Sequence, residues 1–447
     1  MKANVAEPER PSLVDADKRR PAARASHRRR VLFVAETVTL AQCVRLVTLA
    51  RALDPDRYEV HFASADFPDL VFAGAPFVQH RITTLAPEAA ARALESGRRL
   101  YETPDVLRYI DAERRLIRAL DPALVVGDFR LSLSTSAELE SVPSAVLINA
   151  YWSPFARRTA FPVPDHPIVG VLGEALTARY FPRAIPHVFQ HFARPINAAR
   201  ARHGLRPIGS LLEVLTHGSF TLYPDDPWLT PVDAAPSHHL FLGPVCWQPE
   251  LGASESGGAR DADSADLWPD VDPERPRIYV TLGSSGALRL LPMVVEALAR
   301  LPVAAVIATA GRASLGALPA HLTARPFVRG AELARQAALV ISNGGSTTGY
   351  QALVEGTPVL GLPSNFDQHL ASQAIDRAGA GISLAARGAG VESIRESVRR
   401  ALDDPQLARG ARAMAERFAR HDSASVFREF VDVVAGAERA RVDVASR

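Results

Sequence analysis

Residues 339–368, LVISNGGSTTGYQALVEGTPVLGLPSNFDQ, constrain the fold more than any other part of the chain. They contain a short apolar run, a glycine turn, a helical segment, a second apolar run and a polar loop. Short, continuous apolar runs joined through a helix are typical of parallel strands that are buried on both faces. We therefore predict a strand, a crossover helix and a second parallel strand, with the glycine turn at the start of the helix.

The same alternation of strand and helix occurs on both sides of a polar interruption. Before it, four apolar runs alternate with helical segments, at 30–36, 58–64, 123–126 and 144–150. Residues 249–276 are rich in Gly, Ser and Asp, which is typical of a linker, and the alternation restarts at 277. The pattern predicts an α/β protein with two doubly wound, Rossmann-like parallel-sheet domains that face each other across a cleft.

This organisation divides the chain into five parts. They are a disordered basic tail (1–29), a first domain (30–248), a linker (249–276), a second domain (277–425) and a C-terminal helix or tail (426–447). Within the first domain, residues 151–215 are rich in aromatic side chains and prolines and predict a lid or a helical insertion. Ligands of parallel sheets bind at the carboxyl ends of the strands, so we expect the site in the cleft.

The composition excludes several classes of protein. The 447 residues carry a formal net charge of +2, so nucleic acid is not an expected partner. No apolar run is long enough to predict a transmembrane helix. Cys43 and Cys246 are the only cysteines, which excludes a disulfide scaffold and a cysteine zinc site and suits a cytoplasmic protein. The basic tail at 1–29 leaves open a weak peripheral attraction to an anionic membrane.

Two glycine-rich loops of the second domain suit a diphosphate. The first is TLGSSG at 281–286 and the second is SNGGSTTG at 342–349, and each directly follows an apolar run. Glycines let the backbone approach a ligand closely, and free N–H groups at a helix start attract an anion. Neither loop matches a dinucleotide fingerprint, so a nucleoside diphosphate that carries another group fits better. The candidate ligands are Gly283, Ser284, Ser285, Gly344, Gly345, Ser346, Thr347 and Thr348.

A polar pair follows the next apolar run. Asp367 and Gln368 lie in the loop beside the same cleft. A carboxylate next to an amide can form two hydrogen bonds to neighbouring hydroxyl groups of a sugar, although an ordinary polar loop also contains such pairs. Together with the glycine loops, the pair predicts a nucleotide sugar as the ligand.

The stretch from 342 to 368 resembles the donor-site signature of inverting, metal-independent nucleotide-sugar glycosyltransferases of the GT-B fold. That signature is H-G-G-x-G-[ST]-x-x-E-A-L-x-x-G-V-P-x-x-x-x-P-x-x-x-D-Q, and the group includes plant secondary-metabolite, bacterial antibiotic and rhamnolipid glycosyltransferases. In register are the two glycines, Thr348, Ala352, Leu353, Gly356, Pro358, Pro363, Asp367 and Gln368. The resemblance covers most of residues 30–430. It implies that the first domain binds the acceptor, that the second binds the nucleotide sugar, and that neither a metal nor another cofactor is used.

Two departures from the signature concern the donor. The family's diphosphate-binding histidine is Asn343 here, which can still donate a hydrogen bond, and its ribose-binding glutamate is Gln351, which makes weaker, neutral bonds. Among similar enzymes, loss of that glutamate accompanies dTDP-sugars, whose deoxyribose lacks the 2′-hydroxyl. The resemblance therefore favours a dTDP-deoxysugar such as dTDP-rhamnose over a UDP-hexose. It also implies that Phe327 and Val328 seat the nucleobase.

The catalytic base of the family is altered as well. Inverting transfer needs a group that takes the proton of the acceptor hydroxyl. The family's histidine aligns with Gln42, whereas its partner aspartate aligns with Asp128. Three interpretations remain open. Asp128 is the base while Gln42 orients the acceptor; Glu36 or a histidine such as His166 or His187 replaces it; or the chain is a weak or inactive enzyme.

The acceptor pocket is expected in the first domain, built from YWSPF at 151–155 and the prolines that follow. Trp152 and Phe155 are candidates for packing a small lipophilic acceptor, such as a secondary metabolite or a lipid, or for packing the lid itself. Arg157 and Arg158 suit an acidic acceptor group or form a solvated pair. The alternative function is a glycosyltransferase-like partner protein that stabilises or activates another enzyme.

Overall fold

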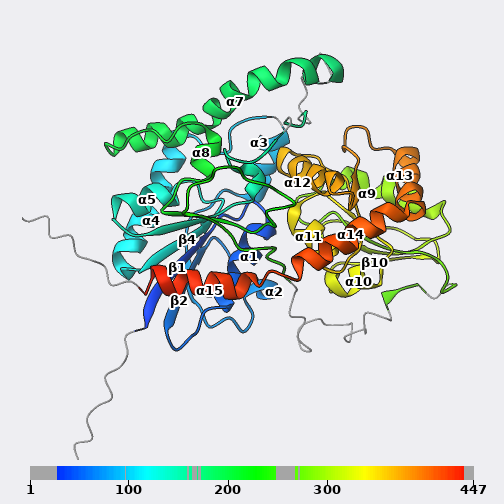
Figure 1. The fold of residues 1–447 in the computed structure, drawn as a ribbon, viewed down its shortest axis with the longest axis horizontal. Helices are drawn as coiled ribbons and strands as arrows, with labels where there is room; N and C mark the ends of the chain where they lie inside the picture. Colours follow the sequence, from blue (N-terminus) through cyan, green and yellow to red (C-terminus); the bar gives the residue numbers. More distant parts are fainter. Residues whose placement is uncertain are drawn as a thin grey trace, which may run out of the picture.

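The computed structural model describes residues 28–95, 97–158, 161–163, 169, 173–247, 267–269 and 272–436. Among these residues, two all-parallel sheets form two α/β domains that lie side by side (Figure 1). The predicted fold class is therefore confirmed. Most of the predicted tail, most of the predicted linker and the residues after 436 lie outside the described residues.

The sheet of the first domain has the strand order β3-β2-β1-β4-β5-β6-β7. Its strands are β1 (Arg29–Ala35), β2 (Tyr58–Ser64), β3 (Val78–Arg81), β4 (Leu124–Asp128), β5 (Ser144–Leu147), β6 (Phe220–Tyr223) and β7 (His239–Phe241). The order reverses between β1 and β4, which end together because Ala35 pairs with Asp128. Such a switch point is where parallel sheets bind ligands.

The sheet of the second domain has the strand order β10-β9-β8-β11-β12-β13. Its strands are β8 (Arg277–Thr281), β9 (Ala304–Ala308), β10 (Leu322–Arg325), β11 (Leu339–Ser342), β12 (Val359–Gly361) and β13 (Gly381–Ser383). The order reverses between β8 and β11, which pair directly and precede the two glycine loops. Both loops therefore lie at one switch point, which a shared diphosphate site requires.

Three strands carry no apolar run and escape prediction from the sequence. These strands, β3, β10 and β13, all lie at the edges of their sheets. The residues of β3 are mostly exposed, whereas those of β1 are mostly buried. An edge strand is covered on fewer sides, so it can keep polar residues such as Gln79, Arg81 and Arg325.

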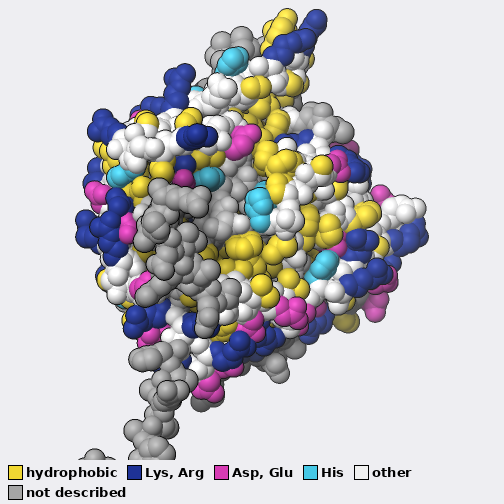
Figure 2. Space-filling model, turned by 60° about the vertical axis from the view of Figure 1, so that its left-hand side comes forward, with side chains coloured by type: hydrophobic (Ala, Val, Ile, Leu, Met, Phe, Trp, Pro, Cys, Tyr) yellow, Lys and Arg dark blue, Asp and Glu magenta, His cyan; other side chains and the backbone are white. Residues whose placement is uncertain are grey.

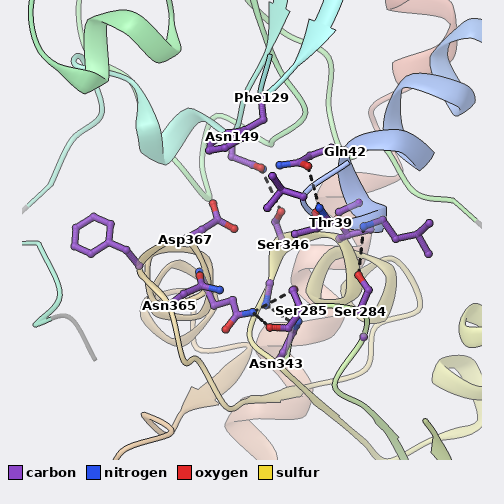
Figure 3. Close-up of a pocket in the computed structure, with 18 of the residues that line it drawn as sticks. Thr39, Gln42, Phe129, Asn149, Ser284, Ser285, Asn343, Ser346, Asn365 and Asp367 are labelled. Carbon is purple, nitrogen blue, oxygen red and sulfur yellow. Dashed lines mark hydrogen bonds between the residues drawn. The ribbon is translucent and has the colours of Figure 1, made fainter. Parts of the chain in front are cut away.

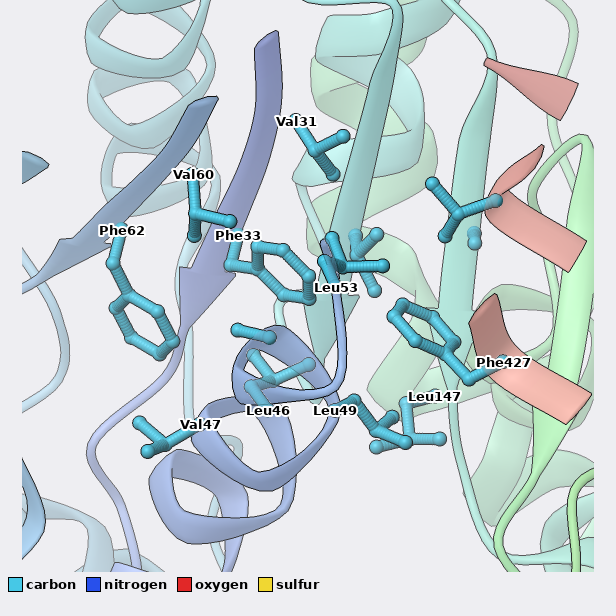
Figure 4. Close-up of a cluster of buried hydrophobic side chains, with 14 of the residues drawn as sticks. Val31, Phe33, Leu46, Val47, Leu49, Leu53, Val60, Phe62, Leu147 and Phe427 are labelled. Atoms are coloured by element: carbon cyan, nitrogen blue, oxygen red, sulfur yellow. The ribbon is translucent and has the colours of Figure 1, made fainter. Parts of the chain in front are cut away.

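The core of the first domain lies between its sheet and α1 (Leu40–Arg51) (Figure 4). The C-terminal helix α15 (Ser423–Val434) completes this core. Phe427 of α15 is fully buried, and its ring centroid lies 6.1 Å from that of Phe33 in β1. The chain thus returns from the second domain to the first, and the helix predicted near 426–447 packs as part of the first domain.

The remaining helices are shorter than α7 (Glu174–Arg202). They are α2 (Asp69–Phe72), α3 (Pro87–Glu95), α4 (Thr103–Leu120), α5 (Leu133–Leu139), α8 (Leu211–Leu215), α9 (Leu291–Ala299), α10 (Gly330–Gln336), α11 (Ser346–Val354), α12 (Phe366–Arg377), α13 (Val391–Asp403) and α14 (Pro405–Phe418), with 3₁₀ turns at Ala150–Trp152 and Leu288–Leu290. Helix α7 gives the predicted insertion a helical form despite Pro182, Pro186 and Pro195. In Figure 1 it crosses the top of the first domain, and one end projects beyond the body of that domain.

A buried carboxylate joins the two domains. Asp225 accepts hydrogen bonds from the Asn149 amide at 2.9 Å and from the Tyr350 hydroxyl of α11. Burial raises the pKa of Asp225, while its hydrogen-bond donors lower it. The neighbouring Asp226 pairs with His421 at 2.8 Å. Both carboxylates are therefore structural, as their position in a proline turn suggests.

Candidate active site

A cavity of about 1110 Å³ lies between the two domains. Its walls include the loops that follow β1, β4, β8 and β11, together with α7. Figure 3 shows that Gln42 and Asn149 enter from the first domain and that Ser285 and Asn343 enter from the second, with Asp367 near both groups. The two sheets thus present their switch points to one cavity, as the strand pattern predicts.

The two glycine loops are joined into one surface. The Asn343 amide donates to Ser285 Oγ at 3.2 Å, and its Oδ1 accepts from the Gly345 N–H at 3.1 Å. Helix α11 begins beside them, and the first N–H groups of a helix lack partners within it. The surface therefore suits an anion such as a diphosphate. The predicted ligands that line the cavity here are Gly283, Ser284, Ser285, Asn343, Gly345, Ser346, Thr347 and Thr348.

Gly344 is the exception in these loops because it does not line the cavity. Its φ is +78°, and a Cβ added there would lie 3.1 Å from the Cβ of Ser372 and 3.3 Å from Pro363. The predicted direct contact is therefore corrected. Gly344 shapes the loop from behind, in a conformation and a space that favour glycine.

The two residues of the predicted sugar-binding pair, Asp367 and Gln368, have different hydrogen-bond partners. The Asp367 Oδ1 accepts from the Trp152 indole N–H at 2.8 Å and from the Tyr151 hydroxyl at 3.1 Å, whereas its Oδ2 bonds to no described residue. The buried Gln368 instead braces the loops, because its Oε1 accepts from the Ser364 N–H at 2.9 Å and its Nε2 donates to the Ser285 carbonyl at 3.3 Å. Asp367 is thus the member of the pair with a free acceptor for a sugar hydroxyl.

The predicted nucleobase seat lies at the cavity wall of the second domain. Phe327 and Val328 both line the cavity, and Phe327 is 48% exposed, so its ring is available to a planar base. Gln351 lies nearby, where its Nε2 donates to the Trp247 carbonyl at 3.0 Å. Its Oε1 lies close to Gly330, because a Cβ added at Gly330 would be only 2.7 Å from that oxygen. The backbone contact thus fixes the amide. Oε1 accepts no hydrogen bond from a described residue, and the Tyr279 hydroxyl lies near it, 3.1 Å from the same added Cβ.

Asp128 ends β4 at the floor of the cavity, where a guanidinium holds both of its oxygens. Arg45 donates from Nε to Oδ2 at 2.9 Å and from Nη2 to Oδ1 at 2.8 Å. A third bond runs from Arg45 Nη1 to Asn149 Oδ1 at 2.7 Å. Burial raises the pKa of Asp128 to about 6, against the opposing effect of Arg45. Asp128 is fully buried and each of its oxygens already accepts one hydrogen bond from Arg45, so only the remaining lone pairs can take a proton from a bound acceptor.

Gln42, which replaces the family's histidine, points into the cavity (Figure 3). Its Oε1 accepts from the Thr39 N–H at 3.1 Å and so helps to start α1. Its Nε2 donates to no described residue. An amide cannot take the proton of a hydroxyl, but this free donor can orient one, so the orienting role of Gln42 stays a prediction.

Glu36 does not line the cavity. It is fully buried, and it accepts from Arg130 at 3.0 Å and from the Leu85 N–H at 2.8 Å. Arg130 also bonds Glu113 at 2.5 Å. The prediction of Glu36 as the base is therefore corrected, because its carboxylate belongs to a buried ion-pair cluster away from the cavity.

Phe155 also lies away from the cavity, and its predicted contact with the acceptor is corrected. Its ring packs edge-on against His239, with centroids 5.6 Å apart. Trp152 does line the cavity. Arg157 pairs with Asp233 at the surface at 2.6 Å, and Arg158 donates to backbone carbonyls. Neither arginine lines the cavity, so the structure offers no support for an acidic group of the acceptor at these positions.

The histidine alternatives have different outcomes. His187 lies on α7 and lines the cavity, so it remains a candidate for accepting the proton. His166 lies outside the described residues. Among the described residues, no group of three or more His, Cys, Asp or Glu side chains is placed to hold a metal ion. No described helix combines the length and the apolar character needed to cross a bilayer.

Apolar side chains that the sequence did not single out form the wall of the cavity in the first domain. This wall contains Leu70, Leu100, Leu131, Phe181, Val188, Phe189, Phe192, Leu211 and Leu215. Those of α7 recur mainly three, four or seven residues apart, as one face of a helix does. The signal is thus present in the sequence, but the prolines between these residues make a continuous helix hard to predict.

Two Rossmann-like domains that enclose a diphosphate-type surface define the GT-B class, and comparisons with known proteins agree. Residues 292–432 match the C-terminal domain of the erythromycin biosynthesis protein CIII-like family. A PGL/p-HBAD biosynthesis glycosyltransferase of Mycobacterium tuberculosis is 41% identical over 394 residues, which cover 88% of this chain and 89% of that protein. A PGL/p-HBAD biosynthesis rhamnosyltransferase of Mycobacterium bovis is 39% identical over 397 residues, which cover 89% and 86%. The chain therefore belongs to this glycosyltransferase family.

Two further comparisons bear on fold and activity. The solved spinosyn rhamnosyltransferase complexed with thymidine diphosphate has a TM-score of 0.61 and 23% identity, and the match covers 90% of this chain and 99% of that one. That likeness shows the fold. A protein of Mycobacterium bovis that is named an inactive PGL/p-HBAD biosynthesis glycosyltransferase is 41% identical over 276 residues, 62% of this chain and 72% of that protein.

Replacing Phe327 with alanine is expected to weaken the binding of a nucleoside diphosphate by about tenfold or more, because stacking of a base on an aromatic ring contributes roughly 1–3 kcal/mol. The side chain is largely exposed, so the midpoint of urea denaturation should stay unchanged. Isothermal titration with a nucleoside diphosphate measures the effect. An unchanged dissociation constant would place the base elsewhere.

Replacing Trp152 with phenylalanine is expected to lower kcat/KM by about tenfold. An aromatic ring is kept, although a smaller one, but Asp367 loses its indole donor, and a hydrogen bond to a charged group contributes roughly 1.5–3 kcal/mol. Trp228→Phe is the matched control, because Trp228 is 52% exposed and lies outside the cavity. Equal effects of the two substitutions would argue against a role of Trp152 in holding Asp367.

Proposed function

We propose that this glycosyltransferase transfers a deoxysugar from a dTDP-sugar to a hydroxyl group of a lipophilic, phenolic acceptor. Rhamnose is the leading candidate for the sugar. Transfer proceeds with inversion of the anomeric configuration. The nucleotide sugar is the donor substrate, and neither a metal nor a cofactor is required. The second domain binds the donor, and the apolar wall of the first domain binds the acceptor.

The observation that carries the donor proposal is the fixed amide of Gln351. One of its N–H groups is used by the Trp247 carbonyl, and Oε1 remains as a single neutral acceptor. A ribose presents two neighbouring hydroxyl donors, whereas a deoxyribose presents only its 3′-hydroxyl. A neutral acceptor satisfies the single donor, but it leaves the extra 2′-hydroxyl poorly paired, which costs roughly 1–3 kcal/mol when the group is buried.

Names of related proteins support the same donor. One relative is named a rhamnosyltransferase, and a structure of the same fold is a rhamnosyltransferase complexed with thymidine diphosphate. The leaving diphosphate would lie against Ser284, Ser285 and the start of α11, where backbone N–H groups and hydroxyls can stabilise its growing charge.

The acceptor proposal combines the apolar wall with the altered base. The relatives act in PGL/p-HBAD biosynthesis by name, and attachment of the first sugar of a phenolic glycolipid requires an acceptor with a free aromatic hydroxyl. A phenol loses its proton near pH 10, far more readily than an alcohol, so it places a smaller demand on the base. Such an acceptor is compatible with Gln42 in the histidine position and with Asp128 engaged by Arg45.

A thermal-shift panel of UDP, dUDP and dTDP tests the donor half of the proposal. A ligand at about 100 times its dissociation constant adds roughly 2.7 kcal/mol to the apparent stability. We expect dTDP and dUDP to raise the unfolding temperature by several degrees more than UDP does. Equal shifts for UDP and dUDP would contradict the role given to Gln351.

The alternative is a partner protein without activity of its own. The related protein that is named inactive favours this alternative, as do Gln42 and Asn343 in place of the two family histidines. Binding of dTDP-rhamnose without turnover, alone and with phenolic acceptors, would move this alternative to first place.

A further inference from the structure

Helix α7 has two faces with different surroundings. Its inner face lines the cavity through residues that include Thr177, Phe181 and Val188. Its outer face carries a stripe of side chains at positions 176, 179, 180 and 183, a spacing that places them on one side of a helix. The inner face is accounted for by the acceptor cavity, whereas none of the four residues of the outer stripe lines that cavity.

The outer stripe combines exposed apolar and basic groups. Leu176 is 51% exposed and Tyr180 is 55% exposed. Arg179 and Arg183 flank them and are also exposed, and the structure shows no described acidic side chain paired with either. Arg179 lies over the Tyr180 ring at 5.8 Å. Figure 2 shows hydrophobic and basic side chains together on the projecting end of the molecule, where α7 lies in Figure 1.

Two other exposed apolar side chains, Val433 and Trp228, lack this combination. Val433 is 72% exposed, but its neighbour Asp432 supplies a negative charge and pairs with Arg57 at 2.8 Å. Trp228 is covered on one side by Arg417, whose guanidinium lies 4.9 Å from the ring centroid. The stripe on α7 therefore differs from these two sites. Its exposed apolar side chains lie beside arginines that pair with no described acidic side chain and can bind an anionic group.

We propose that the outer stripe of α7 docks on an anionic lipid surface, with Leu176 and Tyr180 in the interface and Arg179 and Arg183 at the headgroups. Helices that lie in a membrane interface combine an apolar stripe with basic residues in this way, and arginines near anionic lipids add electrostatic attraction. The inference rests on the lipophilic acceptor of the proposed function. Thr177 and Phe181, which directly follow Leu176 and Tyr180 in the sequence, line the acceptor cavity, so docking would bring its mouth close to lipid.

Co-sedimentation of the full chain with phosphatidylglycerol–phosphatidylcholine vesicles tests the proposal. We expect binding to these vesicles, little binding to pure phosphatidylcholine, and loss of binding as salt screens the charges. Arg179→Gln/Arg183→Gln should lower the partition coefficient on the order of 30-fold, which is about fivefold for each arginine. Leu176→Gln/Tyr180→Gln should lower it by about tenfold. Val433→Gln, at a more exposed apolar position on α15, should bind like the unaltered chain.

Three outcomes would overturn the proposal. The first is absence of binding to anionic vesicles, and the second is unchanged binding of both double variants. The third is a loss of vesicle binding in Val433→Gln that equals the loss in the double variants. Because every variant keeps the basic N-terminal residues, unchanged binding would assign attraction to those residues instead of to α7. The shift in unfolding temperature with dTDP, measured without vesicles on the same variants, reports folding and the donor site separately. Failure of docking can thus be told apart from failure of the proposed function.

Discussion

Replacement of Asp128 by alanine is expected to lower the free energy of unfolding by about 3–5 kcal/mol. The variant leaves the Arg45 guanidinium buried without the carboxylate that now accepts two of its hydrogen bonds. Asn149 would remain as its partner, but an amide oxygen does not balance the charge. Urea denaturation, followed by circular dichroism, measures the loss.

The surface supplies a matched control for this effect. Arg157 and Asp233 form the same two-bond pair, at 2.9 and 2.6 Å, but their side chains are 67% and 54% exposed. Exposed pairs contribute roughly 0–1 kcal/mol, so Asp233→Ala should cost little. The double variant Arg45→Met/Asp128→Leu should recover most of the lost stability, because it leaves no unpaired charge. A loss in Asp128→Ala no larger than in Asp233→Ala would contradict this account.

The double variant Arg45→Met/Asp128→Leu also tests whether Asp128 is the catalytic base. If the Arg45–Asp128 pair only anchors the cavity floor, the double variant should keep measurable turnover once its fold is restored. If Asp128 takes the acceptor proton, turnover should be lost even in the stable double variant. If the double variant keeps turnover, His187 is the remaining candidate for the base that lines the cavity. In that case His187→Gln is expected to lower kcat.

Replacing Gln351 with glutamate is expected to shift nucleotide preference towards ribose by about tenfold or more. A carboxylate accepts stronger, charge-assisted hydrogen bonds and can pair with both hydroxyls of a ribose, whereas the amide offers one neutral acceptor. The sharpest measurement compares UDP with dUDP, which differ only in the 2′-hydroxyl. Isothermal titration should show dUDP binding at least as tightly as UDP in the unaltered chain and more weakly than UDP in the variant.

Gln351→Ala serves as the control for this switch. It removes the side chain without adding charge, so it should weaken both nucleotides to a similar degree. The carboxylate of Gln351→Glu would also face the Trp247 carbonyl in place of the present hydrogen bond, which a denaturation measurement must take into account. An unchanged ratio of UDP to dUDP affinity in Gln351→Glu would show that this position does not read the ribose.

The sequence predicts most of the fold because buried parallel strands have a distinctive composition. The apolar runs at β1, β2, β4, β8 and β11 locate the centres of both sheets, and the glycine loops follow from their position after β8 and β11. The edge strands could not be predicted in this way, since exposure lets them keep polar residues. The return of α15 to the first domain also escapes a local pattern, because its partner Phe33 lies almost 400 residues away in the chain.

The site was less predictable where the direction of a side chain decides its role. Ala35 pairs with Asp128, so the next residue, Glu36, points to the other face of the sheet. There it meets Arg130, far away in the sequence. The register of two strands thus separates two carboxylates that both follow an apolar run. Likewise, the bond between Arg45 and Asp128 depends on the packing of α1 against β4, which no local pattern of residues predicts.

The most direct test of the central claim is a single-turnover assay of the purified chain with dTDP-rhamnose and a long-chain alkyl 4-hydroxybenzoate, read by mass spectrometry of the acceptor. Our account predicts one added deoxyhexose on the phenolic hydroxyl, together with release of dTDP, and a much slower reaction with UDP-glucose. Transfer from UDP-glucose at an equal or higher rate, or binding of dTDP-rhamnose without any transfer to the phenol, would contradict it.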